Sequence, residues 1–155
     1  MRRSEREIKS FFEILDVIEK SDVVRVSFFD GEYPYIVPLS FGFEANGENI
    51  RLYFHCACEG KKIALIQKNN KVCFECDIFE GYHGSGMNVT TFYKSVIGVG
   101  EICKCENKEK VKGLELLMKH CGYEAEREML LKCAMLEKTT VFRLDVKKIS
   151  GKSNG

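Results

Sequence analysis

A glycine followed by two lysines, Gly60-Lys61-Lys62, is the group of residues in this sequence best suited to bind an anion. The residues from Lys61 to Lys68 have the length and spacing of a short helix. Ammonium groups in a first turn face the positive end of the helix dipole, at a cost of about 0.3–1 kcal/mol each without a bound anion. A phosphate reverses that sign, because glycine permits close approach and the first amide N–H groups point outward. This pattern predicts an anion site; the alternative is a solvated lysine pair on a surface turn.

The two prolines of the chain, Pro34 and Pro38, lie in one apolar segment that reads as a strand over residues 33–43. Proline cannot donate to a strand ladder, so this strand must be unpaired along one edge at these points. Its free backbone could bind a planar polar heterocycle; the alternative is an edge strand that proline protects from aggregation. Such a ligand would contact Val37, Leu39, Ser40 and Phe41.

His55 ends a strand expected over residues 50–55, directly before the loop that leads to the lysine pair. We expect its side chain to point near those lysines. It is then the one candidate for proton delivery or substrate contact, although a histidine in this position is more often a hydrogen-bonded surface residue.

The eight cysteines are candidate metal ligands. Cys73 and Cys76 have zinc-knuckle spacing, but residues three apart in a strand point to opposite faces. The pairs Cys56/Cys58 and Cys103/Cys105 share faces if extended, yet no turn surrounds either pair. A structural metal or a thiol redox centre stays open beside buried or incidental thiols.

The elements that position these residues follow from hydrophobic spacing and turn residues. A capping box at Ser4 predicts a helix to about Lys20. Strands are expected over 24–28, 33–43, 50–55, 71–79, 91–105 and 140–149, helices over 61–68, 107–120 and 124–136, and a glycine-rich loop over 80–87. Hairpin-linked strands with inserted helices favour a mainly β, antiparallel fold, a closed Greek-key barrel, over a parallel sheet.

Length and charge narrow the function classes. The 155 residues suit one domain, expected over 1–152 with a loose tail at 153–155. With 24 Lys and Arg against 23 Asp and Glu, the net charge of +1 gives no bulk field for nucleic acid or a membrane surface. Neither a signal peptide nor an apolar span is visible, so we expect a cytoplasmic protein with reduced thiols.

Three segments together resemble a known family. They are Tyr33–Phe43, Leu52–Lys62 and Asn69–Glu75, and Ser95–Gly100 and Val141–Lys152 are also similar to it. The family is the nitroimidazole-resistance (Nim) branch of the pyridoxamine 5′-phosphate oxidase-like flavoproteins, and the resemblance covers roughly Arg3 to Lys152. The segments 82–91 and 123–136 are its least typical parts. The sequence lacks the C-terminal Arg and His cluster with which true pyridoxamine phosphate oxidases hold their substrate, which argues against vitamin B6 oxidation.

The resemblance implies an FMN-binding split β-barrel that forms homodimers with FMN at the interface. It assigns the flavin phosphate to Gly60, Lys61 and Lys62, and the ribityl chain and ring to Val37, Pro38, Leu39 and Ser40. His55, Cys56 and Ala57 would complete this site, and Ser95 and Val96 would add contacts across the dimer.

The implied activity is reduction of a small acceptor, such as a nitroaromatic, with hydride from NADH or NADPH. One alternative is a flavin-binding protein without turnover that stores flavin, senses it or passes electrons. A second is a cysteine-based metal or redox protein. No catalytic triad, paired carboxylates or dinucleotide fingerprint in the sequence decides among them.

Overall fold

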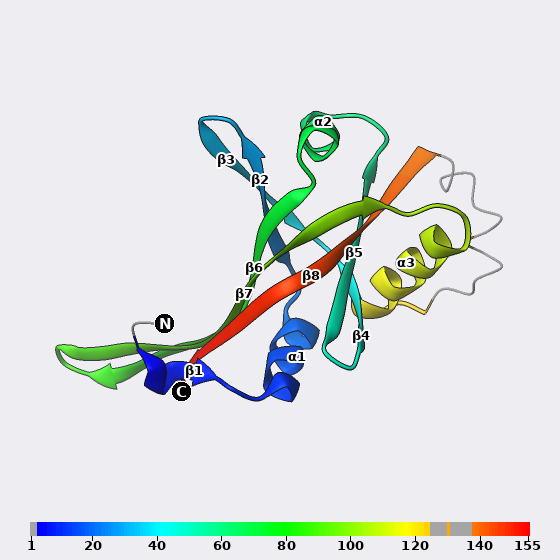
Figure 1. Ribbon diagram of the computed structural model, residues 1–155. Coiled ribbons are helices and arrows are strands. Elements are labelled where there is room, and N and C mark those ends of the chain that lie inside the picture. Colours follow the sequence, from blue (N-terminus) through cyan, green and yellow to red (C-terminus); the bar gives the residue numbers. More distant parts are fainter. Residues whose placement is uncertain (1–2, 125–129, 131–137) are drawn as a thin grey trace.

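The computed structural model describes residues 3–124, 130 and 138–155 (Figure 1). The strands are β1 (Glu7–Ile8), β2 (Val24–Asp30), β3 (Tyr33–Leu39), β4 (Gly42–Asn46), β5 (Asn49–Ala57), β6 (Lys71–Ser85), β7 (Asn88–Lys104) and β8 (Thr139–Asn154). A 3₁₀ turn, η1 (Ser4–Arg6), precedes three helices, α1 (Phe11–Lys20), α2 (Lys61–Lys68) and α3 (Asn107–His120). The mainly β, antiparallel architecture agrees with the sequence pattern.

The sheet follows the order β3-β2-β6-β7-β8-β5-β4, with β1 added to β8. Its two end strands, β3 and β4, are consecutive in the chain and are separated by Ser40 and Phe41. The sheet therefore curls around one core but stays open along the seam between them, which makes the barrel split rather than closed. In Figure 1, α2 lies between the β2–β3 hairpin and the end of β5, α1 lies at the opposite end and α3 covers one side.

Alternate residues of the strands fill the core. Its large fully buried side chains include Phe28, Phe54 and Phe74, and α1 adds Val17 and Ile18. A smaller cluster under α3 contains Tyr53, Cys105 and Val141. Gly113 is needed there, since a Cβ at that position would lie 2.8 Å from the Tyr53 ring.

The structure of both chain ends differs from the sequence prediction, because the N-terminal and C-terminal residues pair with each other. Glu7 and Ile8 form β1 against Lys152 and Gly151 instead of starting the first helix. The helix begins after Ser10, whose hydroxyl accepts the Glu13 N–H at 3.5 Å. A Cβ at residue 151 would lie 2.8 Å from Ile8, so glycine permits this close packing.

The expected loose tail at 153–155 is wrong, since β8 continues to Asn154. The Asn154 side-chain amide donates to the Thr91 carbonyl at 2.5 Å and contacts the Thr90 hydroxyl at 3.1 Å. These bonds tie the chain end to β7.

Two other boundaries were wrong. The strand expected over 33–43 is broken at Ser40 and Phe41, where the fully buried Phe41 ring anchors the turn into β4. The loop expected over 80–87 is a continuation of β6 and β7, which pair as far as Ser85 and Asn88. Its glycines permit a register shift after Phe79 and the tight turn that joins the two strands.

The helix expected over 124–136 lies almost wholly outside the described residues. Within the described ranges, none of the helices combines the length and apolar character needed to cross a membrane.

Candidate functional site

The N-terminus of α2 is a helix end without a cap. Gly60 precedes it with φ +133°, a conformation that side chains strain to adopt. The Gly60 carbonyl accepts the N–H groups of Ile63 and Ala64 at 3.1 and 3.2 Å, but no side chain caps the helix and its first turn holds no acidic residue. Among the described residues, no side-chain cap or acidic residue of the first turn thus compensates the positive end of the helix.

The two lysines of this turn have different surroundings. Lys61 Nζ lies 2.5 Å from Asp30 Oδ2 and 4.6 Å from the Tyr35 ring centre. The hydrogen bond to Asp30 raises the pKa of Lys61 above its usual value. Lys62 Nζ lies 5.7 Å from the Phe54 ring centre, and no carboxylate of the described residues pairs with it. Of the two lysines, Lys62 is therefore the one whose charge is available to a ligand, whereas Asp30 partly neutralises the charge of Lys61.

The end of β5 separates the expected site residues onto two faces. Phe54 and Cys56 point toward the core and α2, and Cys56 is half-buried against the core. Burial raises the pKa of the Cys56 thiol, with Lys62 opposing that rise. His55 is exposed and lies on the other face, which it shares with Tyr53 under α3 and with Ala57. The expectation that His55 points toward the lysine pair is wrong, because successive strand residues alternate in direction.

The edge position of β3 is confirmed. The strand pairs only with β2 within the described sheet, and both prolines take positions from which an N–H would point away from β2. Ile36 has the same orientation as Pro34 and Pro38, so its N–H and C=O face the open edge.

The residues expected to line a ring differ in accessibility. Pro38 and Ser40 are exposed, while Val37 and Leu39 are half-buried and pack against the core. Of these four residues, the side chains most accessible to a ligand are therefore those of Pro38 and Ser40, next to the backbone of Ile36.

Ser95 and Val96 are not brought to this end of the barrel. Ser95 pairs with Asp77 and Lys152 across neighbouring strands, and Val96 is fully buried in the core. Ser95 is six positions along β7 from Glu101, which pairs with Lys71 just after α2. This is roughly 20 Å at ~3.3 Å per residue. Within one chain, these two residues therefore do not contact the α2 site, and their contact across a dimer stays a prediction.

Three residues near the lysines escaped the sequence reasoning: Asp30, Tyr35 and Phe54. Asp30 was visible in the sequence only as a turn residue. The aromatic pair was visible as alternate members of two strands, but nothing local indicated that α2 would lie over both.

The opposite directions of Cys73 and Cys76 are confirmed, since one is exposed and the other buried. Among the described residues, no group of three or more His, Cys, Asp or Glu side chains could hold a metal ion.

A second charged cluster lies where α3 meets β4, β5 and β8, beside a cavity of about 630 Å³. Its cations are Arg51, Lys112 and Arg143, and its carboxylates are Glu44, Glu109 and Asp145. Each cation contacts at least one carboxylate, and the Tyr53 hydroxyl donates to Glu44 at 2.7 Å. Burial and the Glu44 carboxylate both raise the pKa of Tyr53, which keeps this hydroxyl protonated. The cluster supplies its own counter-ions.

Comparison with known proteins agrees with this architecture. The sequence profile of the family described as pyridoxamine 5′-phosphate oxidase matches residues 12–153, most of the chain. The chain therefore belongs to the pyridoxamine 5′-phosphate oxidase-like family. Its fold is the split barrel of that family. No curated protein matches the chain.

Solved structures share the fold. A candidate 5-nitroimidazole antibiotic resistance protein from Bacteroides thetaiotaomicron is 25% identical, with a TM-score of 0.78 over 94% of this chain and 85% of that chain. An FAD-binding protein from Mesorhizobium loti is 22% identical, with a TM-score of 0.69 over 97% of this chain and 98% of that one. An FAD and heme binding protein from Mycobacterium smegmatis is 16% identical, with a TM-score of 0.76 over 97% and 74%. The similarity to the nitroimidazole-resistance group thus extends from sequence segments to the fold.

Proposed function

We propose that this protein binds FMN and uses it to reduce a small acceptor, such as a nitroaromatic, with hydride from NADH or NADPH. The observation that carries the proposal is the uncapped N-terminus of α2 with Lys62 free of any described carboxylate. Backbone N–H groups, a helix dipole and ammonium groups form a donor set that fits a phosphate monoester.

Relatives support a flavin rather than another phosphate ester. Two of the similar structures are named for FAD binding, and a third is named for resistance to 5-nitroimidazole antibiotics. FMN suits this chain better than FAD, because the turn at Gly60 to Lys62 offers one compact anion site.

The chain's own residues bind and orient. Lys62 and the first turn of α2 hold the phosphate. Lys61 also contributes positive charge, which its ion pair with Asp30 reduces. The open edge of β3 presents the Ile36 backbone and Ser40 to the polar edge of a flat ring. When bound, FMN supplies hydride-transfer chemistry. Cys56, half-buried beside this space, contributes an uncharged neighbour, since its pKa is raised.

A second copy of the chain completes the site in this proposal. The α2 end leaves a ligand open to solvent on the side of the β3 edge, and a partner would exclude that water. We propose that Ser95 acts across such a homodimer, and that the protein works in the cytoplasm on small molecules.

The test is the absorption spectrum of the freshly purified protein and identification of the flavin released by heating. Bound FMN together with NADH or NADPH oxidation, accelerated by a nitroaromatic, is the expected result. Bound FMN without oxidation of either nicotinamide would leave a flavin-binding protein without turnover. A colourless protein that does not bind added FMN would overturn the proposal.

A further inference from the structure

Residues 81–85 of β6 and 88–92 of β7 form a two-stranded arm that extends beyond the barrel. Figure 1 shows it projecting from the end opposite to α2. In the described structure, β8 pairs with β7 only from Tyr93 onward, so no third strand supports the arm. Isolated two-stranded ribbons are marginally stable in water, which indicates that the arm packs against another surface.

The arm has two unlike faces. On one face, His83 stacks on Phe92 with ring centres 4.0 Å apart, and the chain end at Gly155 lies against Phe92. On the other, Tyr82 and Val89 are 72% and 59% exposed, and Tyr82 makes an edge contact with Phe79 at 5.2 Å. The second face is apolar and uncovered.

This apolar face continues onto the outer surface of the sheet, away from the core. Ile36, Ser27, Cys73 and Val99 lie side by side there across β3, β2, β6 and β7. Phe79 lies on the same side of β6 as Cys73, with Glu75 and Asp77 between them, so one face of the sheet runs from the arm to the barrel.

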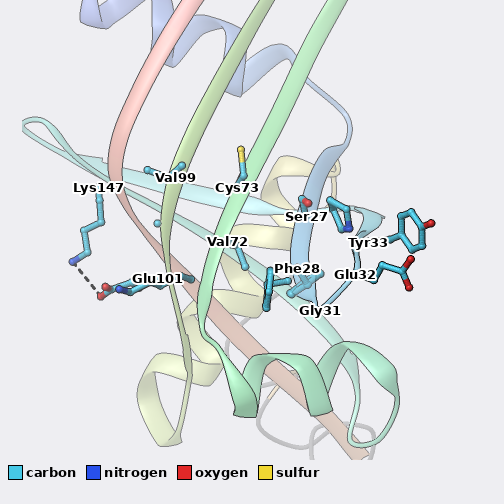
Figure 2. A pocket seen from close by; sticks show the side chains of 14 residues that line it. Ser27, Phe28, Gly31, Glu32, Tyr33, Val72, Cys73, Val99, Glu101 and Lys147 are labelled. Carbon is cyan, nitrogen blue, oxygen red and sulfur yellow. Dashed lines mark ion pairs between the residues drawn. The ribbon is translucent and has the colours of Figure 1, made fainter.

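A cavity of about 490 Å³ lies at the far end of that surface. Its lining includes Ser27, Phe29, Tyr33, Pro34, Cys73 and Val99. Figure 2 shows Tyr33 and Glu32 on one side of it, and the ion pair of Lys147 with Glu101 on the other. The cavity is separated from the arm by the stretch of β6 from Cys73 to Tyr82, roughly 30 Å at ~3.3 Å per residue.

We propose that a second copy of this chain covers the outer surface, and that each arm inserts its Tyr82 and Val89 face into the partner's cavity. A projection at one end of a face and a hollow at the other are self-complementary under a two-fold axis that crosses the strands between them. One rotation then forms both contacts and leaves neither arm unsupported. The proposal rests on the homodimer proposed above and specifies its contact surface.

The amount of exposed apolar surface on this face is consistent with contact to a second copy of the chain. Six large side chains of the surface, Phe29, Ile36, Phe79, Tyr82, Val89 and Ile97, are each between 53% and 72% exposed. Spread along this face, they leave roughly 600–700 Å² of apolar surface in total, near the ~800 Å² per partner of a standard interface.

The middle of the surface carries both signs of charge. Arg25 Nη1 lies 3.0 Å from Glu75 and 2.6 Å from Asp77. A two-fold related copy presents the same groups in reverse order, so that Arg25 of one chain faces carboxylates of the other.

A disulfide cross-link tests the contact, because Cys73 is exposed in the cavity. Val89→Cys should give a covalent dimer on mild oxidation, and Val89→Cys combined with Cys73→Ser should not. Thr90→Cys, on the opposite face of the same strand, is the matched control for the other exposed thiols. Tyr82→Ser should raise the dimer dissociation constant in sedimentation at least tenfold, and Thr90→Ser should leave it unchanged.

The outcomes separate this inference from the proposed function. A dimer without the Cys73-dependent cross-link, or one that Tyr82→Ser does not weaken, overturns the arm contact but leaves a dimer formed elsewhere. A monomer overturns the arm contact and the dimer together. FMN binding, measured by absorbance on the same samples, is a separate readout: a dimer that binds FMN but fails the arm tests overturns this inference and leaves the proposed function standing.

Discussion

Two charged regions of this protein look alike in composition but differ in how their charges are satisfied. Around Arg143, each cation contacts a carboxylate of the same chain. At the start of α2, Asp30 pairs with Lys61, while Lys62 and the helix N-terminus have no described counter-ion. The cluster at Arg143 borders a cavity of about 630 Å³, yet of these two regions it is the start of α2 that has charge left for a ligand among the described residues.

The difference shows that cavity size alone does not identify a binding site here. A self-neutralised cluster stabilises the packing of helix on sheet, and its removal should appear in the free energy of unfolding. An uncompensated helix end contributes little to stability, and its removal should appear in ligand affinity.

The largest effect is expected from Arg143→Met. This change removes the guanidinium group, only 20% exposed, that pairs with Glu109 and Asp145, and leaves Asp145 with Arg51 alone among the described residues. It should lower the free energy of unfolding by about 2 kcal/mol. Urea denaturation measures it. The matched control is Arg25→Met, whose partners lie on the sheet surface and whose loss should cost less than ~1 kcal/mol. Weakened FMN binding by the Arg143 variant with unchanged stability would make this cluster a ligand site.

The next largest effect concerns Lys62→Ala. It should weaken FMN binding about tenfold, in keeping with the roughly 1.5 kcal/mol of one hydrogen bond to a charged group, and leave stability unchanged. Lys61→Ala should have a smaller effect, because Asp30 already takes part of its charge. Fluorescence titration of FMN measures both, with Lys68→Ala at the other end of α2 as control. Equal losses for Lys62 and Lys68 would show that α2 contributes only general charge.

The sequence predicted this region better than the cluster at Arg143 for a physical reason. The Gly60-Lys61-Lys62 signal is local, because the glycine, the lysines and the helix start are adjacent in the chain, and the structure begins α2 at Lys61 as expected. The mainly β, antiparallel fold and the edge position of β3 were similarly visible in strand spacing and in proline chemistry, whereas the split of the barrel was implied only by the family resemblance.

What could not be predicted depends on contacts between distant segments. The Arg143–Glu109 pair joins β8 to α3, and the pairing of Ile8 with Gly151 joins the two chain ends. The direction of His55 is a different case, because strand alternation from Phe54 was available in the sequence, but the expectation followed the position of His55 directly before the loop to the lysines.

A smaller effect is expected from pH. Burial acts to raise the pKa of Glu44, but hydrogen bonds from Lys112 and Tyr53 outweigh it and hold that pKa below its usual 4.5. A carboxyl group with a lowered folded-state pKa contributes stability above the unfolded value, and this is lost as pH falls through the folded value. Lys112→Met should therefore flatten the loss of stability below about pH 4.5, by less than ~1 kcal/mol. A curve of unchanged shape, measured by denaturation from pH 6 to 3, would contradict this coupling.

The smallest effect should come from His55→Ala, which tests whether the site is confined to one face of β5. His55 points away from the face on which Phe54 and Cys56 lie beside Lys62, so its loss should change FMN affinity and the rate of nicotinamide oxidation less than twofold. Cys56→Ser is the matched variant, one residue on and on the opposite face, and should shift the flavin absorption or its affinity where the histidine variant does not. If His55→Ala keeps FMN but loses turnover, the alternation argument fails and this histidine regains its place as the proton donor. Both variants unchanged would place the ring away from the end of β5, and the open edge of β3 would then carry the ring contacts alone.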